Sequence, residues 1–366
     1  MRNIKIICLF LIFIILSCGK DQPVINAGDL EHIGYSPQGY EYKRPPFYPK
    51  MEYPADNPPT VEGIALGRRL FYDPILSRDS SMGCFSCHKQ ELAFTDGAAT
   101  SIGVDGINGR RSSMSLVDVG FNYKGMFWDG RAATLEEQAL GPVTDPVELH
   151  TTWPEVEQKL RRHNAYPQLF RKAFGIKDRK EITKELAAKA IAQFERTIMT
   201  TGQSKYDRFK QNLDFFDYDE SQGLDMFFDK QPFLLPDAQC GHCHNEPMFT
   251  TNDYFNNGIS PAKYAFQFLD KGRAEFSLDS NDVGKFRTPG LRNIMLTGPY
   301  MHDGHLKTIE DVMDHYMSGG HPSPKRDPLI AQIELTQEQR TQIIAFLKTL
   351  TDNGVLQDTT LSNPYK

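Results

Sequence analysis

Cysteine is scarce in this sequence, and the positions of the few cysteines argue against a fold held by disulfide bridges. There are 6 Cys among 366 residues. Cys8 and Cys18 lie near the N-terminus, and the other four stand in two five-residue strings. If the strings use their own cysteines, Cys8 is discarded with a signal peptide and Cys18 carries a lipid, no thiol is left for a disulfide bridge. The folded chain must then be stabilised by side-chain packing and by any group that is bound to the two strings.

The apolar run near the N-terminus is too short to span a bilayer. It covers residues 6–16, an apolar run of 11 that follows Arg2 and Lys5. This pattern is typical of a signal peptide. The string Leu16-Ser17-Cys18-Gly19 is similar to a bacterial lipobox, in which the cysteine becomes the lipid-bearing first residue. We interpret residues 1–18 as a lipoprotein signal peptide and expect a lipid anchor at Cys18, on the periplasmic side of the cell envelope. Simple secretion is the alternative.

Net positive charge is also absent, which argues against nucleic acid as a partner. The formal net charge is −6. This sign permits weak attraction to a basic redox protein. The hydrophobic content of 39% and the charged content of 24% are ordinary for a soluble protein. The length allows two globular domains.

The two strings share the pattern Cys-x-x-Cys-His, which is typical of covalent haem attachment. They contain Cys84, Cys87 and His88, and then Cys240, Cys243 and His244. Two thiols one helical turn apart can add to the two vinyl groups of a porphyrin, and the adjacent histidine can bind the iron. Zinc is the alternative, but the second pair of zinc ligands normally lies farther along the chain. A redox-active cysteine pair would need no histidine. We therefore predict two haem c groups.

The rest of the chain predicts helices around each string. Helices are expected from Thr60 to before Asp73, and at residues 134–141, 180–200, 219–229 and 336–350, with caps at Thr60, Thr134 and Thr336 and a stop at Gly202. Strand signals are weak. We predict an all-α fold of two cytochrome-c-like domains in tandem, residues 60–202 and 203–352. An extended surface segment, residues 19–59, precedes them, and a loose polar tail, residues 353–366, follows.

The sixth iron ligand decides between an electron carrier and an enzyme, because a carrier fills both axial positions. Residues 89–127 contain no histidine, and Met114 and Met126 are the only strong ligand types there. An open first haem is compatible with this composition, and methionine ligation stays an alternative.

Beyond the haem strings, the chain resembles the bacterial dihaem cytochrome c peroxidase family, which includes the MauG-type enzymes. The resemblance covers residues 63–350. It rests on the strings LGRRLF at 66–71, FWDGRA at 127–132, DPVE at 145–148, TPGLRN at 288–293 and PYMHDG at 299–304. It implies an active site near the domain interface, with a peroxidatic N-terminal domain and an electron-transfer C-terminal domain.

The resemblance also implies roles for individual residues. Trp128 matches the tryptophan between the two haems, and Gln138 and Glu148 match the polar pair beside the peroxidatic haem. Some members carry a histidine in the loop after the first haem that blocks the iron, whereas residues 101–106 of this chain contain none. We therefore predict that the first haem is five-coordinate at rest and active without prior reduction.

Two further sites follow from the resemblance. Tyr316 matches the distal ligand of the second haem in MauG-type proteins, and a slip of one residue would place Met317 there instead. The family binds Ca²⁺ between the haems. Thr297 and Pro299 match its carbonyl ligands, but Ser113 stands where the family has asparagine, a stronger hard-oxygen ligand.

We predict a cytochrome c peroxidase that reduces hydrogen peroxide to water with electrons from a small periplasmic protein of the cytochrome c or cupredoxin type. One alternative is a MauG-type oxidase that modifies a protein or another large substrate. The other is a dihaem electron carrier without catalytic activity.

Overall fold

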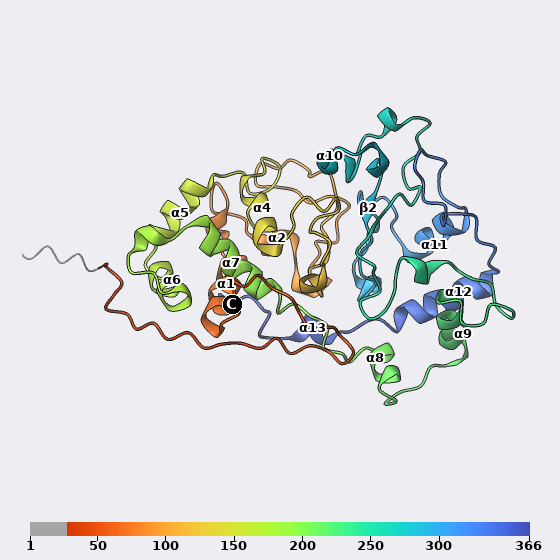
Figure 1. Cartoon of the computed structure of the whole chain (residues 1–366), viewed down its shortest axis with the longest axis horizontal. Helices are drawn as coiled ribbons and strands as arrows, with labels where there is room; N and C mark the ends of the chain where they lie inside the picture. Colours follow the sequence, from red (N-terminus) through yellow and green to blue (C-terminus); the bar gives the residue numbers. More distant parts are fainter. Residues whose placement is uncertain (1–27) are drawn as a thin grey trace, which may run out of the picture.

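The structure is a computed structural model that describes residues 28–366. The proposed signal peptide and Cys18 lie outside the described residues. The helices are α1 Val61–Phe71, α2 Cys84–Cys87, α3 Leu135–Gln138, α4 Gly141–Thr144, α5 Trp153–Arg162, α6 Tyr166–Phe174, α7 Lys184–Glu195, α8 Lys205–Lys210, α9 Tyr218–Phe227, α10 Ala274–Ser277, α11 Ile309–Met317, α12 Gln337–Lys348 and α13 Gly354–Gln357. Two short antiparallel strands, β1 Tyr254–Phe255 and β2 Phe286–Arg287, form the sheet of the described part. The prediction of a helical fold is confirmed (Figure 1).

Two predicted helix starts are confirmed in atomic detail. The hydroxyl group of Thr60 accepts a hydrogen bond of 2.9 Å from the backbone N–H of Gly63, at the start of α1. Thr336 and Gln339 exchange hydrogen bonds at the start of α12. Such caps satisfy backbone N–H groups that have no partner within the helix.

Two helix predictions need correction. The helix expected at residues 134–141 is divided into α3 and α4, and Pro142 stands in the first turn of α4 because it cannot donate inside a helix. The helix expected at 180–200 is shortened to α7. Asp118 explains its early end: its backbone N–H donates to Ile198 and its carboxylate accepts from the backbone N–H of Thr200. Gly202 lies in the connection after the helix, with a φ of +75°.

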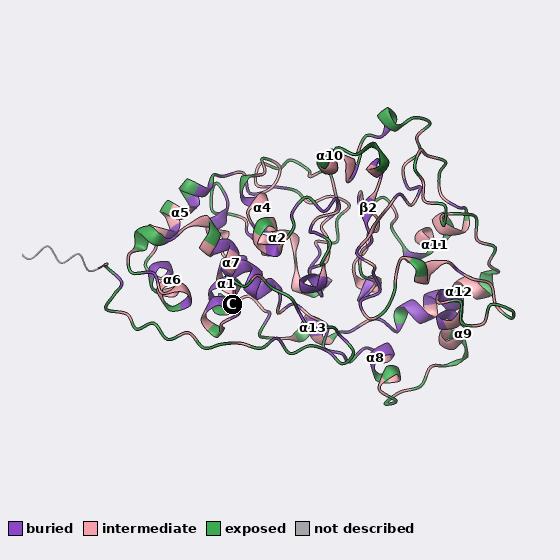
Figure 2. Ribbon diagram, viewed as in Figure 1, coloured by how far each residue is buried: buried purple, intermediate pink, exposed green. Residues whose placement is uncertain are grey.

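The chain forms two main hydrophobic cores, each built on a crossed pair of helices (Figure 2). In the first core, α1 packs on α7, and a Cβ atom at Gly67 would lie 1.8 Å from the carbonyl oxygen of Ala190. In the second core, α9 packs on α12, and a Cβ atom at Gly223 would lie 2.1 Å from the carbonyl oxygen of Gln342. Glycine therefore permits close helix contact in both halves.

The C-terminal tail is not loose, contrary to the expectation from its polar composition. Val355 and Leu361 are buried against the first half of the chain, in a cluster with Phe71 and Phe194. The phenol group of Tyr72 donates to the carbonyl oxygen of Leu361 at 2.7 Å. The tail is ordered because its few apolar side chains find partners that lie far away in the sequence.

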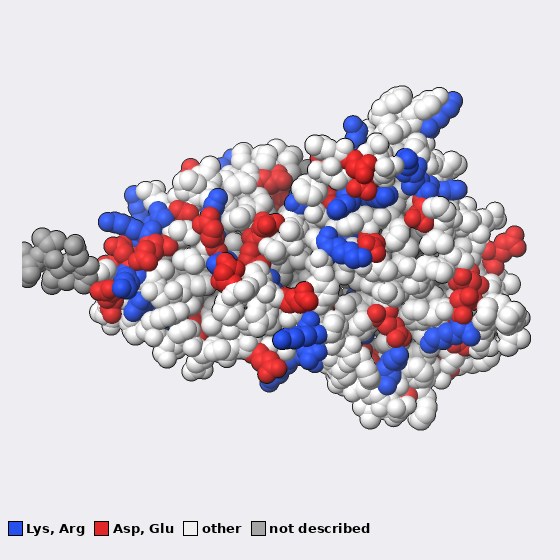
Figure 3. All heavy atoms as spheres, viewed as in Figure 1, with Lys and Arg blue, Asp and Glu red and all other residues white. Residues whose placement is uncertain are grey.

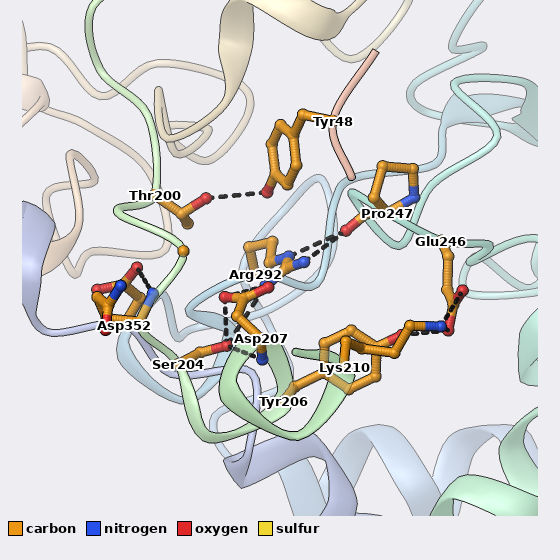
Figure 4. A network of polar contacts seen from close by, with 12 residues as sticks. Tyr48, Thr200, Ser204, Tyr206, Asp207, Lys210, Glu246, Pro247, Arg292 and Asp352 are labelled. Carbon is orange, nitrogen blue, oxygen red and sulfur yellow. Dashed lines mark hydrogen bonds and ion pairs between the residues drawn. The ribbon is translucent and has the colours of Figure 1, made fainter. Parts of the chain in front are cut away.

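Two buried polar clusters meet where the two halves of the chain are connected, and the guanidinium carbon of Arg292 in one lies 5.5 Å from the centre of the Tyr48 ring in the other (Figure 4). Tyr48, from the extended segment that precedes α1, hydrogen-bonds to Thr200 and Asp118. Asp207 in α8 pairs with Arg292, which also donates to the carbonyl oxygen of Pro247. On the face displayed in Figure 3, basic and acidic side chains are interspersed.

Candidate active site

Each Cys-x-x-Cys-His string lines a cavity of its own. The first cavity contains Cys84, Cys87 and His88 in its wall, together with Gln138, Glu148 and Trp128. The second cavity contains Cys240, Cys243 and His244, together with Tyr316, Met301 and Trp128. The structure thus brings the residues singled out from the sequence into two adjoining sites, and Trp128 lies in the wall of both.

The two histidines have the same local geometry. The Nδ1 atom of His88 lies 2.9 Å from the carbonyl oxygen of Phe94, and the Nδ1 atom of His244 lies 2.9 Å from that of Phe249. A carbonyl oxygen only accepts, so Nδ1 carries the proton and Nε2 keeps its lone pair. Burial lowers the pKa of His88, and it lowers the pKa of His244 to about 4. Both rings are therefore neutral at pH 7 and suited to bind iron.

The thiols fit the same cofactor. Among residues 28–366, Cys84, Cys87, Cys240 and Cys243 form no disulfide bridges. In each string both cysteines and the histidine line one cavity. This combination of two free thiols and one neutral imidazole is what covalent haem attachment requires. The donor groups of both cavities fit haem c.

Glu148 and Gln138 are the polar side chains expected to act in the first cavity. Gln138 ends α3, whose start is capped by Thr134. Glu148 is positioned by its backbone, which donates to the carbonyl oxygen of Asp145 and accepts from the N–H of Val104 at 2.8 Å. Burial, and secondarily the charge of Asp145, raises the pKa of Glu148 to about 7. This carboxyl group can therefore both take up and release a proton near neutral pH.

Trp128 is held between the two cavities by its backbone and its side chain. The indole N–H donates to the carbonyl oxygen of Ser112 at 3.0 Å. The backbone carbonyl oxygen of Trp128 accepts from the N–H of Arg287 at 2.7 Å. Trp128 is thus tied to the first half by its ring and to the second half by its backbone.

Tyr316 and Met317 differ in their relation to the second cavity. Tyr316, on α11, lines it, and Met317 is not among its lining residues. The side-chain amide nitrogen of Asn257 lies 3.3 Å from the phenol oxygen of Tyr316 and 3.3 Å from the sulfur atom of Met301. Burial raises the pKa of Tyr316 to about 12, although the hydrogen bond from Asn257 lowers it.

The three residues considered for calcium, Thr297, Pro299 and Ser113, all line the second cavity. The hydroxyl group of Ser113 donates to the carbonyl oxygen of Cys87 at 2.6 Å. Within residues 28–366, no group of three or more His, Cys, Asp or Glu side chains could hold a metal ion.

Sequence reasoning missed Glu195 and Arg287. Glu195 lines the first cavity, is buried, and has a carboxylate oxygen without a hydrogen-bond partner among the described residues. Burial raises its pKa to about 8. Its sequence signal is a charged residue that directly follows the uncharged stretch AIAQF of α7. Arg287 lines both cavities.

These observations define a helical protein with two haem c sites that share a wall. A family model described as "Di-haem cytochrome c peroxidase" matches residues 61–214. The methylamine utilization protein MauG of Methylorubrum extorquens is 33% identical over 312 residues, covering 84% of this chain and 83% of the relative. The cytochrome c551 peroxidase of Nitrosomonas europaea is 33% identical over 298 residues, covering 81% of this chain and 82% of the relative.

A solved structure supports the same assignment. The crystal structure of a MauG-like protein associated with microbial copper homeostasis superposes with a TM-score of 0.79 at 32% identity, covering 89% of this chain and 100% of that one. The chain belongs to the di-haem cytochrome c peroxidase family, as its sequence motifs predicted, and its cofactors are two haem c groups. The relatives are named both as peroxidases and as MauG.

Within the described part of the chain, no helix is both long and apolar enough to cross a membrane.

Proposed function

We propose that the protein is a dihaem cytochrome c peroxidase that reduces hydrogen peroxide to water. The reaction takes up two protons and two electrons for each peroxide and forms two waters. The observation that carries the proposal is the carboxyl group of Glu148. It lines the same cavity as His88, and its pKa of about 7 suits a group that must both accept and donate a proton.

The residues of the first cavity have separate roles in this proposal. Bound haem supplies an iron that binds peroxide and exchanges electrons. Glu148 takes the proton from the near oxygen of peroxide and delivers it to the departing oxygen. The amide group of Gln138 orients the two oxygens. Trp128 connects the first haem to the second, because its ring lies in the wall that the two cavities share.

The first haem is proposed to be five-coordinate at rest. Ser101 and Gly103 line the first cavity, and the loop to which they belong contains no histidine. An electron paramagnetic resonance spectrum of the oxidised protein should therefore contain a high-spin ferric signal. A spectrum with low-spin ferric haem alone would contradict this coordination.

Tyr316 is proposed as the distal ligand of the second haem, with Met317 as the alternative. Its place in the wall of the second cavity supports this choice. A phenolate is a hard anionic donor and lowers the reduction potential, whereas a thioether raises it. Asn257 would donate to the phenolate oxygen and hold the ring.

Two other functions are alternatives, and an observation favours the first of them. A MauG-type oxidase acting on a protein or another large substrate is favoured by tyrosine at position 316 and by relatives named MauG. A non-catalytic dihaem electron carrier would have two six-coordinate haems and negligible peroxide turnover.

Peroxide added to the purified, oxidised dihaem protein tests these functions. The peroxidase predicts a rapid change of the optical spectrum and, with a reduced small cytochrome c or cupredoxin, sustained consumption of peroxide. A spectral change without turnover by either donor would favour the MauG-type function. If peroxide causes no spectral change and is not turned over, the electron carrier is the function that remains.

The remaining assignments are part of the same proposal. We place the protein on the periplasmic side of the envelope, with a lipid anchor at Cys18 as its membrane contact, and divide it into cytochrome-c-like domains at 60–202 and 203–352. The two helix pairs, α1 with α7 and α9 with α12, support this division. Calcium between Thr297, Pro299 and Ser113 can be tested by elemental analysis before and after chelation.

A further inference from the structure

The wall between the two cavities contains one charged side chain. The residues that line both cavities are Ser112, Ser113, Met114, Ser115, Asn122, Trp128 and Arg287. All except Arg287 are neutral at pH 7. Arg287 belongs to β2, where its backbone pairs with Tyr254 of β1 and donates to Trp128. Its position is therefore determined by the sheet and by Trp128.

The guanidinium group of Arg287 has only neutral partners among the described residues. Its Nε atom donates to the carbonyl oxygen of Phe127 at 3.3 Å, and one Nη atom donates to the amide oxygen of Asn252 at 3.2 Å. The other Nη atom lies 3.5 Å from the sulfur atom of Met114. These contacts are long, and no carboxylate lies within ion-pair distance among residues 28–366.

Burial makes this arrangement costly. Arg287 is 4% exposed. Burial lowers its pKa to about 10, so it still carries a positive charge at pH 7. A buried charge without a counter-charge costs several kcal/mol. An anion at this wall would remove much of that cost.

Arg292 provides a comparison, because it is a buried arginine of the same chain that is paired with a carboxylate. It lies five residues after Arg287 and is likewise buried. One of its Nη atoms lies 2.8 Å from both carboxylate oxygens of Asp207 (Figure 4). A protein carboxylate thus neutralises Arg292, whereas the side chains of residues 28–366 leave Arg287 without an anion.

Haem supplies carboxylates, because each haem c carries two propionate groups. A guanidinium group presents paired N–H donors that match a carboxylate. We propose that Arg287 forms an ion pair with haem propionates at the wall between the cavities and thereby raises the reduction potential of the haem it pairs with. The potential rises because a fixed positive charge favours the form of the haem that has gained an electron.

This inference rests on the two haem c groups and not on the proposed peroxidase activity. Its test measures equilibrium potentials and requires no peroxide. Loss of peroxide turnover with intact potential shifts would overturn the proposed function alone.

The test compares four forms of the dihaem protein by spectroelectrochemical titration. They are the unchanged protein, Arg287→Met, Arg287→Lys and Asn252→Leu. Arg287→Met removes the charge, Arg287→Lys retains it, and Asn252→Leu removes a neutral partner while leaving the charge. Haem content and the unfolding midpoint are measured for each form.

In Arg287→Met, the ratio of reduced to oxidised haem at a fixed potential should fall about ten-fold for at least one haem, or about 59 mV for a one-electron couple. Arg287→Lys and Asn252→Leu should stay within about three-fold of the unchanged protein. Unchanged potentials for both haems in Arg287→Met, or equal shifts in the Met and Lys forms, would overturn the ion pair.

If Arg287→Met does not incorporate both haems, the unchanged protein still tests the inference. Its haem propionates are labelled with ¹³C, and the infrared difference spectrum between oxidised and reduced protein is recorded. The labelled carboxylate bands should be those of an ionised, guanidinium-bound group. Bands of a protonated carboxylic acid, or of a freely hydrated carboxylate, would contradict the proposal.

Discussion

One Nη atom of Arg292 lies 2.8 Å from each carboxylate oxygen of Asp207, and both side chains are 4% exposed. Asp207 belongs to α8, whereas Arg292 follows β2 and also donates to the carbonyl oxygen of Pro247, three residues after His244. The pair therefore joins the connection between the two halves to the second haem string.

Asp207→Asn should lower the free energy of unfolding by about 3–5 kcal/mol, because it leaves the Arg292 charge buried without a partner. Urea unfolding of the dihaem protein measures this loss. Asp214→Asn is the matched control, since the Asp214–Arg208 pair of 3.1 Å is exposed and should contribute less than about 1 kcal/mol. Equal losses of unfolding free energy in the two variants would contradict the prediction that the buried ion pair contributes more than the exposed one.

Glu148→Gln should slow the first reaction with peroxide by about 10²–10⁴-fold, because glutamine cannot transfer the proton. Stopped-flow absorbance measures this rate. The pKa of Glu148 is about 7, and the proposed reaction begins with its base form, so the rate of the unchanged protein should rise as the pH increases through about 7. Glu148→Gln should lose this rise. An unchanged rate in the variant would remove Glu148 from the proposed chemistry.

Tyr316→Phe should change the optical and electron paramagnetic resonance spectra of the second haem, because it removes the phenol oxygen that we propose as the iron ligand. Met317→Leu is the control and should leave both spectra as they are. If the two variants gave the opposite result, Met317 would be the ligand and the proposed register would be wrong by one residue.

Leu361→Ala should destabilise the protein by about 2–5 kcal/mol, because this tail residue is 2% exposed and its removal leaves a cavity. Thr360→Ala, at an exposed neighbour, should change the free energy of unfolding by less than about 0.5 kcal/mol. Denaturant titration of both variants measures these changes in the free energy of unfolding. A loose tail would give two small and equal effects.

Local patterns in the sequence were sufficient to predict several features of the structure. The haem strings, the caps at Thr60 and Thr336, and the helical fold class each depend on residues that are close together in the chain. A cap joins groups three residues apart, and a haem string joins groups five residues apart or fewer, so their geometry follows from local spacing. The resemblance to the family added four candidate site residues to these predictions: Trp128, Gln138, Glu148 and Tyr316.

Other features depend on tertiary contacts and could not be predicted from local patterns. The early end of α7 depends on Asp118, and the order of the tail depends on Phe71 and Tyr72, which are distant in sequence. Among the described residues, one carboxylate oxygen of Glu195 and the charge of Arg287 have no partner, and neither has a sequence signal comparable to a motif, because a missing partner is a property of three-dimensional surroundings. The sequence alone was enough to predict where two haems attach. Only the tertiary structure placed Trp128 and Arg287 in one wall between them, because burial and proximity arise from packing and not from local spacing.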